Sequence, residues 1–145
     1  MRRILFVFLL ALMSVSCEKA EYMLEYGKEL KGYVTEQEWE DIHITDGKWV
    51  TSDYYLYSEN SNRWIKKNLS ETDGFPAHSY IFYQDGTVNK STPPQKWQFN
   101  NSDSTLIIGS ISYKVIGVEA DKLYLYVTDD HGATPMIQTF VRHKL

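Results

Sequence analysis

From Gly47 onward the chain is divided into short runs of aromatic and β-branched residues, separated by turn residues. Runs that alternate apolar and polar positions are typical of half-buried strands, because successive side chains of a strand point to opposite faces. The chain also contains eleven Tyr, four Trp and six Phe, which pack well on a pleated surface. We therefore expect residues 47–145 to form an antiparallel all-β domain of seven to eight strands, a sandwich or barrel.

Local signals divide this domain into hairpins. Asp85-Gly86 between two apolar runs predicts a tight turn, because glycine tolerates a positive φ. The alternation in Ile111–Val118 predicts a strand that pairs with Thr105–Ile108 and has one wet face. Residues 58–77 are polar around a short apolar interruption, and they fit a strand, a helix or a flap.

The first 16 residues have the pattern of an export signal. Arg2 and Arg3 precede an apolar run from Ile4 to Met13, and small residues follow it up to Cys17. The apolar run is about half the length of roughly 20 residues that a membrane-spanning helix needs. We expect residues 1–16 to be a signal peptide.

Cys17, the sole cysteine, stands directly after the small residues. This arrangement resembles the lipobox of bacterial lipoproteins, in which the thiol is acylated and then becomes the first residue of the mature chain. Ser14 occupies the place where the family usually has Leu, so cleavage by the general signal peptidase is the competing outcome. The resemblance implies lipidation at Cys17 and localisation in the cell envelope, at the outer membrane.

Residues 17–46 are expected to be the lipid attachment site, a tether and a short helix. The segment from Glu18 is polar and acidic, which predicts disorder in its first half. Thr35-Glu36-Gln37-Glu38 has the form of a capping box, in which the threonine hydroxyl and a glutamate satisfy exposed amides at the start of a helix. The sequence therefore predicts a short helix that begins after Thr35.

Charge and side-chain chemistry narrow the possible partners. Removal of residues 1–16 takes away Arg2 and Arg3 and no acidic residue, so the net charge changes from −4 to −6. Nucleic acid and anionic lipid headgroups are poor partners for a chain that is acidic as a whole. With Cys17 acylated, no thiol remains for a disulfide.

No arrangement of residues indicates an enzyme. The histidines lie on separate segments, at His43, His78, His131 and His143. Asp129-Asp130-His131 could contribute to a metal site, but it lacks further ligands nearby and fits a solvated turn. Ser110 fits a hairpin tip better than a nucleophile elbow. We expect no catalytic activity, no cofactor and no metal.

Two motifs at the ends of the β-domain resemble lipocalin-like (calycin) barrels: Gly47-Lys48-Trp49 and Thr139-Phe140-Val141-Arg142. In that family a Gly-x-Trp on the first strand meets a basic residue of the last strand, so Trp49 and Arg142 are the implied barrel-closure residues. The physical argument agrees, because the first and last strands of a barrel must pair and a guanidinium binds well over an indole ring.

Asp85-Gly86-Thr87, Trp97 and the closing strand also resemble small lipocalin-like lipoproteins of Bacteroidota-type bacteria. The resemblance implies a small up-and-down β-barrel that binds a small apolar or amphipathic ligand, with unknown ligand-binding residues. An eight-stranded barrel can equally be filled by its own side chains. The alternative is therefore a filled barrel, an interaction or structural module that contacts another envelope protein or a glycan.

Overall fold

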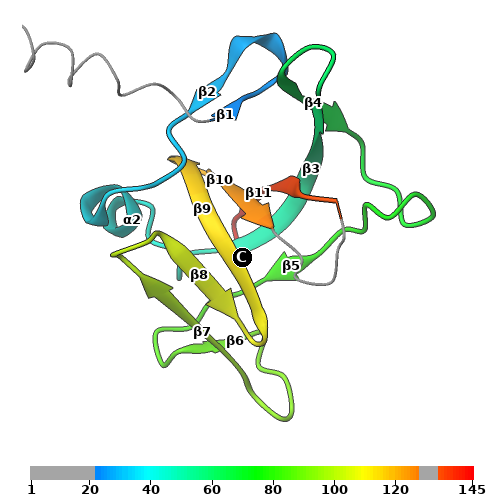
Figure 1. The fold of residues 1–145 in the computed structure, drawn as a ribbon. Helices are drawn as coiled ribbons and strands as arrows, with labels where there is room; N and C mark the ends of the chain where they lie inside the picture. The colour runs from blue at the N-terminus through cyan, green and yellow to red at the C-terminus, as the bar shows by residue number, and fades with distance from the viewer. Residues whose placement is uncertain (1–21, 128–133) are drawn as a thin grey trace, which may run out of the picture.

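The structure is a computed structural model that describes residues 22–127 and 134–145. It is mostly antiparallel β-sheet with one small α-helix, as the sequence predicts (Figure 1). The strands are β1 (Tyr22–Met23), β2 (Glu29–Leu30), β3 (Lys48–Ser58), β4 (Arg63–Lys67), β5 (Ser79–Tyr80), β6 (Thr87–Val88), β7 (Gln95–Asn100), β8 (Thr105–Ile108), β9 (Ile111–Glu119), β10 (Lys122–Val127) and β11 (Met136–His143). The helices are the 3-10 turn η1 (Glu25–Gly27) and the α-helix α2 (Glu36–Asp41).

The strands form one large sheet and one small one. The nine-stranded sheet has the order β4-β3-β11-β10-β9-β8-β7-β6, and β5 pairs with β3 beside this path. This continuous path does not close on itself. β1 and β2 pair only with each other as a two-stranded sheet. The last strand, β11, thus lies between β10 and the long first strand of the domain, β3.

The predicted turn at Asp85-Gly86 is present. Gly86 has φ +86°, and its amide donates to the carbonyl of Tyr83 at 3.0 Å. Asp85 Oδ1 accepts hydrogen bonds from the amide and the hydroxyl of Thr87, which lowers the pKa of this exposed carboxyl. The strands on either side of this turn are short, since β5 covers only Ser79–Tyr80 and β6 only Thr87–Val88.

Thr35 caps the start of α2, which is the threonine half of the predicted capping box. Thr35 Oγ1 accepts a hydrogen bond from the amide of Glu38 at 3.1 Å. Trp39 and Ile42 lie on the same face and are both buried in the main core. The Trp39 ring stacks on Phe99 of β7 with 3.9 Å between centroids, so the helix covers this end of the sheet.

The segment that precedes α2 differs from the prediction of disorder, as far as the structure describes it. Tyr22, Leu24 and Leu30 are buried, and they pack in a second cluster on the opposite face of the sheet from the main core. The other buried members of this cluster are Tyr55, Trp64, Ile116, Tyr124 and Ile137. A few apolar residues in a mostly polar segment thus form a layer that covers this face of the sheet. The average composition of the segment does not predict such a layer.

The prediction that the β8–β9 hairpin has one wet face is confirmed as far as Lys114, because Ser112 is exposed and Lys114 half-buried while Tyr113 and Val115 are buried. It is wrong from Ile116 onward, where the covering layer buries the second face as well. Val115 belongs to the main core, whereas the adjacent Ile116 belongs to the second cluster, and both are fully buried. The register between β9 and β10 shifts at this point, from Tyr124 opposite Gly117 to Leu125 opposite Val115. Such a shift indicates a β-bulge at Ile116. Along this part of β9 both faces of the sheet are therefore covered.

Candidate functional site: the Trp49 and Arg142 pair

The two residues predicted to close the domain lie in contact. Trp49 on β3 is the register partner of Arg142 on β11, and the guanidinium carbon lies 4.5 Å from the centroid of the indole ring. Trp49 is fully buried, and its indole N–H donates to the carbonyl of Ile44 at 2.9 Å. A cation over a desolvated ring contributes about 2 kcal/mol.

Arg142 also binds the backbone of two connections. Its Nη1 donates to the carbonyl of His43 at 3.0 Å and of Asp46 at 3.3 Å. Its Nη2 donates to the carbonyls of Ile42 and Ala120. The Nε atom lies 3.1 Å from Asp121 Oδ1, an ion-pair distance outside hydrogen-bond geometry. Thus one side chain holds the α2–β3 connection and the β9–β10 turn against the last strand.

Gly47 permits this close approach. Its φ is +79°, and a β-carbon at this position would lie 2.7 Å from the carbonyl oxygen of His143 and 2.9 Å from Arg142 Cγ. Any other residue would therefore push against β11 as well as adopt an unfavourable backbone conformation. The glycine of the Gly-x-Trp motif is needed because the Arg142 stem occupies the space of its side chain.

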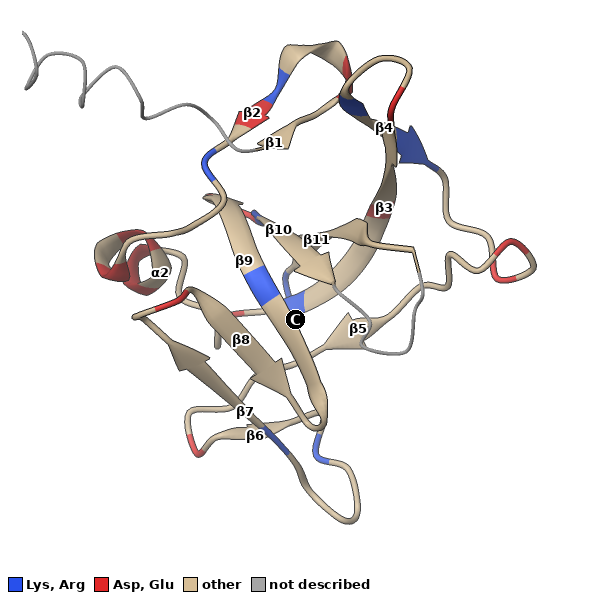
Figure 2. Cartoon of the chain, in the orientation of Figure 1, with Lys and Arg blue, Asp and Glu red and all other residues tan. Residues whose placement is uncertain are grey.

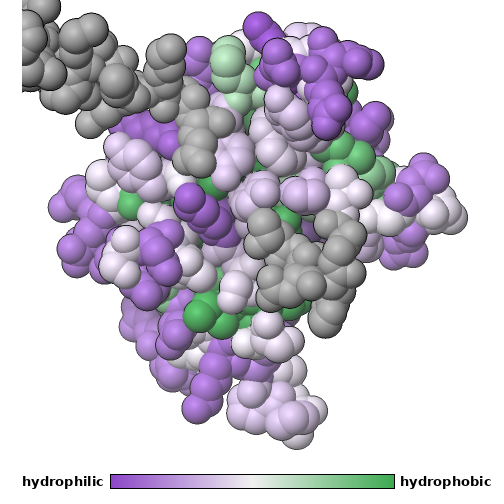
Figure 3. Space-filling view, viewed as in Figure 1, coloured by the Kyte–Doolittle hydropathy of each residue, from purple (hydrophilic) through white to green (hydrophobic). Residues whose placement is uncertain are grey.

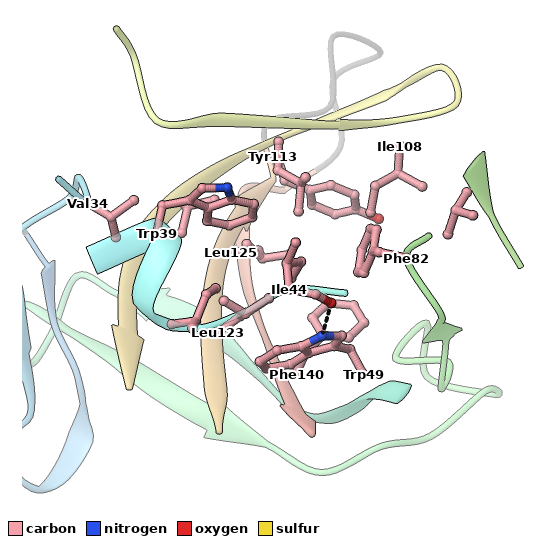
Figure 4. Close-up of a cluster of buried hydrophobic side chains, with 14 residues drawn as sticks. Val34, Trp39, Ile44, Trp49, Phe82, Ile108, Tyr113, Leu123, Leu125 and Phe140 are labelled. Atoms are coloured by element: carbon pink, nitrogen blue, oxygen red, sulfur yellow. Dashed lines mark hydrogen bonds between the residues drawn. The ribbon is translucent and has the colours of Figure 1, made fainter. Parts of the chain in front are cut away.

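The space above Trp49 is filled by side chains of the main core (Figure 4). The buried members are Val34, Trp39, Ile42, Ile44, Trp49, Phe82, Val88, Leu106, Ile108, Tyr113, Val115, Leu123, Leu125 and Phe140. Phe82 meets Trp97 edge-on with 5.4 Å between centroids, and Tyr80 lies 5.6 Å from Phe140. Residues from the connections as well as from the strands therefore pack on the inner face of the sheet.

Two buried tyrosines, Tyr54 and Tyr113, place hydroxyl groups in this interior. Tyr54 donates to the carbonyl of Pro76 at 2.5 Å, and burial together with the nearby Tyr80 raises the pKa of Tyr54 to about 12. Burial and a hydrogen bond with Tyr80 also raise the pKa of Tyr113. These phenols stay protonated at neutral pH, so they act as neutral hydrogen-bonding groups and not as bases. Gln138 Oε1 is buried and has no partner among the described residues.

Two hollows lie outside this core. One holds about 160 Å³ between β2 and β9, where Lys28 forms an ion pair with Glu119 and the hydrogen bond from Lys28 lowers the pKa of that carboxyl. The other holds about 550 Å³ on the β3–β4 hairpin, beside Leu56 and Ile65. Drug-sized ligand sites enclose about 300 to 1,000 Å³. Neither hollow is lined by a residue of the main core.

The outer surface is mostly polar on the face shown in Figure 3, where apolar surface occurs in small separate areas. Among the described residues, the exposed large apolar and aromatic side chains are Tyr26, Tyr33, Tyr57, Leu69, Ile111 and Leu145. Tyr26 is 92% exposed, which sets it apart from the half-exposed tyrosines.

The other residues singled out in the sequence are not brought together. Within the described ranges, no group of three or more His, Cys, Asp and Glu side chains could hold a metal ion. Ser110 lies in the turn between β8 and β9. Asp129-Asp130-His131 and Cys17 lie outside the described residues. Over residues 22–127 and 134–145, no helix is long and apolar enough to cross a membrane.

Comparison of the chain with protein-family models, with curated proteins and with solved structures gave no match. The lipocalin-like resemblance therefore stays a prediction from the sequence motifs, and the contact between Trp49 and Arg142 is a fact of the geometry alone.

Proposed function

We propose that this chain is a lipid-anchored protein of the cell envelope, whose domain is a lipocalin-like β-barrel with a filled interior that serves as an interaction module. The observation that carries the proposal is the main core, in which Trp49, Phe82 and Phe140 are each at most 2% exposed. A carrier needs an apolar cavity with an open mouth, whereas here the equivalent space is occupied by large rings.

Three contacts support a barrel. β3 pairs with β11 along one edge and with β5 along the other, through Trp49 opposite Tyr80. After β5 the chain continues to an isolated bridge between Phe82 and Val88 of β6. The strand order from β6 to β11 then leads back to β3. A seam of short pairings through the β5 segment would thus complete a ring that the continuous ladder leaves open.

The anchor rests on the sequence before the described residues. The basic start, the short apolar run and the small residues before Cys17 support acylation in a bacterial envelope. The partner would be another envelope protein or a glycan.

The experiment is mass spectrometry of the full chain purified from bacterial membranes, first native and then after denaturing extraction. We expect the mass of an acylated chain that begins at Cys17, with no further molecule released on unfolding. A stoichiometric small molecule released on unfolding would overturn the filled interior and support the carrier. Cys17→Ala should abolish the lipid mass and membrane retention, whereas the control Ser16→Ala, which keeps a small residue at that place, should preserve both.

A further inference from the structure

We infer that the end of the molecule formed by η1 and the β3–β4 turn rests on the phospholipid bilayer that holds the Cys17 lipid, with the Tyr26 ring at the level of the headgroups. This inference rests on the proposed lipid anchor and adds to it the surface that faces the membrane.

Only a short length of chain joins the lipid at Cys17 to the folded domain. Tyr22 is 8% exposed and is fixed in β1, opposite Leu30. Its ring lies 5.9 Å from that of Trp64 and 5.5 Å from that of Tyr126. Five Cα-to-Cα steps separate Cys17 from Tyr22, and fully extended they span at most about 18 Å. The headgroup layer takes up roughly 5 to 7 Å of that distance.

The surface nearest to this attachment point belongs to η1 and the β3–β4 hairpin. Leu24, two residues after Tyr22, forms a parallel bridge with Trp64 of β4. The amide of Lys66 donates to Glu25 Oε2 at 2.9 Å. β1, η1 and the β3–β4 hairpin therefore form one end of the molecule, and β6 and β7 lie at the opposite end (Figure 1). A short tether at Tyr22 keeps the first of these ends close to the bilayer.

This end of the molecule exposes two tyrosine rings. Tyr26 has φ +65° at the tip of η1, a turn that is closed by the hydrogen bond from the Leu24 amide to the Lys28 carbonyl at 2.7 Å. The turn thus presents an almost fully exposed aromatic ring. Tyr57, which is 49% exposed, lies at the same end and contacts the ring of Trp64 at 5.5 Å. Tyrosine suits a membrane interface, since its ring is apolar and its hydroxyl stays in water.

Charged side chains are distributed unevenly over the molecule. The chain as a whole is acidic, and α2 carries Glu36, Glu38, Glu40 and Asp41. On β4, by contrast, neither Arg63 nor Lys67 has a carboxylate within ion-pair distance among the described residues. Figure 2 shows Lys and Arg on β4 and beside β2, together with acidic residues on β2, at η1 and in the β3–β4 turn, so this end carries mixed charge, whereas α2 is predominantly acidic. Arg63 and Lys67 can therefore meet lipid phosphates, while net repulsion turns the acidic helix away.

The test places a spin label at each end of the acylated full chain. Because Cys17 is the sole cysteine and is consumed by acylation, Asn60→Cys in the β3–β4 turn and Gln84→Cys near β6 each offer one free thiol. The labelled proteins are reconstituted in vesicles of phosphatidylethanolamine and phosphatidylglycerol. Accessibility of each label to a water-soluble nickel relaxation agent is then measured by electron paramagnetic resonance.

We expect the label at position 60 to be about threefold less accessible to nickel than the label at position 84, with the difference lost in detergent. Tyr26→Ser should raise the accessibility at position 60 towards that at position 84. The control Ile111→Ser, which changes a 43% exposed apolar residue of the β8–β9 hairpin beside β7, should leave it unchanged. Equal accessibility at both positions in an acylated protein would overturn the docking, and a mass without acyl chains would overturn the anchor on which it rests.

Discussion

Arg142 connects three parts of the chain that are far apart in sequence: Trp49, the α2–β3 connection and the β9–β10 turn. Its side chain is only 13% exposed, and its hydrogen bond to the Ile42 carbonyl is part-buried, whereas the bonds to the other three carbonyls lie at the exposed surface. Removal of this side chain takes the cation from the indole and leaves the Ile42 carbonyl without its donor, while water can reach the other three.

We predict that Arg142→Ala lowers the free energy of unfolding by about 2 kcal/mol, because the fully buried indole loses its cation and the part-buried carbonyl of Ile42 loses its donor. Lys144→Ala, two residues later on an exposed side chain, should change it by less than about 0.5 kcal/mol. Urea unfolding followed by tryptophan fluorescence measures both. Equal, small effects would show that the contact does not stabilise the domain.

Gly47 and Gly86 offer a matched pair of glycines. Both have a φ near +80°, but a β-carbon would meet β11 at Gly47 and nothing within 4 Å at Gly86. Gly86→Ala should lower the free energy of unfolding by about 1 to 2 kcal/mol, because alanine is strained in this backbone conformation. Gly47→Ala should lower it further, because His143 or Arg142 must also move. The same urea experiment checks this difference, and equal costs would contradict the steric account of the Gly-x-Trp motif.

At the scale of elements, the N-terminal layer is a structural part of the domain from Tyr22 onward. Leu24 is 1% exposed and packs in the cluster on the outer face of the sheet, whereas Tyr26 two residues later is almost free of contacts. Covering this face with residues 22–30 protects the apolar side chains of β3, β9, β10 and β11 from water.

Leu24→Ala should lower the free energy of unfolding by about 2 to 4 kcal/mol, the range for a large-to-small change in a core. Tyr26→Ala should stay within about 0.5 kcal/mol of the parent, as expected for a surface residue. Thermal melting followed by circular dichroism gives both values. If Leu24→Ala melts like the parent, this segment does not pack as described.

How far the elements could be predicted depends on whether their signal is local. The turn at Asp85-Gly86 and the cap at Thr35 are set by neighbouring residues, and both are present. The covering layer depends on contacts between residues about 90 apart, such as Leu30 against Gly117, and no local pattern encodes them. The segment 58–77 contains β4, which the local pattern left undecided because Trp64 packs against the distant Tyr22.

The candidate site, too, could be predicted from the sequence only in part. The motifs at both ends of the domain identified Trp49 and Arg142 as a pair, because the first and last strands have to meet for a closed sheet. The four carbonyls that Arg142 binds could not be foreseen, because they belong to connections whose course depends on the packing of α2 and the β9–β10 turn.

At the scale of the whole molecule, the domain has two apolar clusters, one on each face of a curved sheet. We propose that the sheet also closes into a barrel around the main core, which is the central claim about this fold. The closure depends on the seam between β3, the β5 segment and β6, where the pairings are shortest.

Amide hydrogen exchange at this seam, resolved by NMR on the mature chain, tests the claim most directly. The amides of Thr51, Tyr83 and Asn89 donate to carbonyls across the seam, each at 2.9 Å. In a closed barrel they exchange within about tenfold of the central amides of β10, because opening them requires cooperative unfolding. If they exchange as fast as the surface turn at Gly74 while β10 stays protected, the barrel is open and the central claim is wrong.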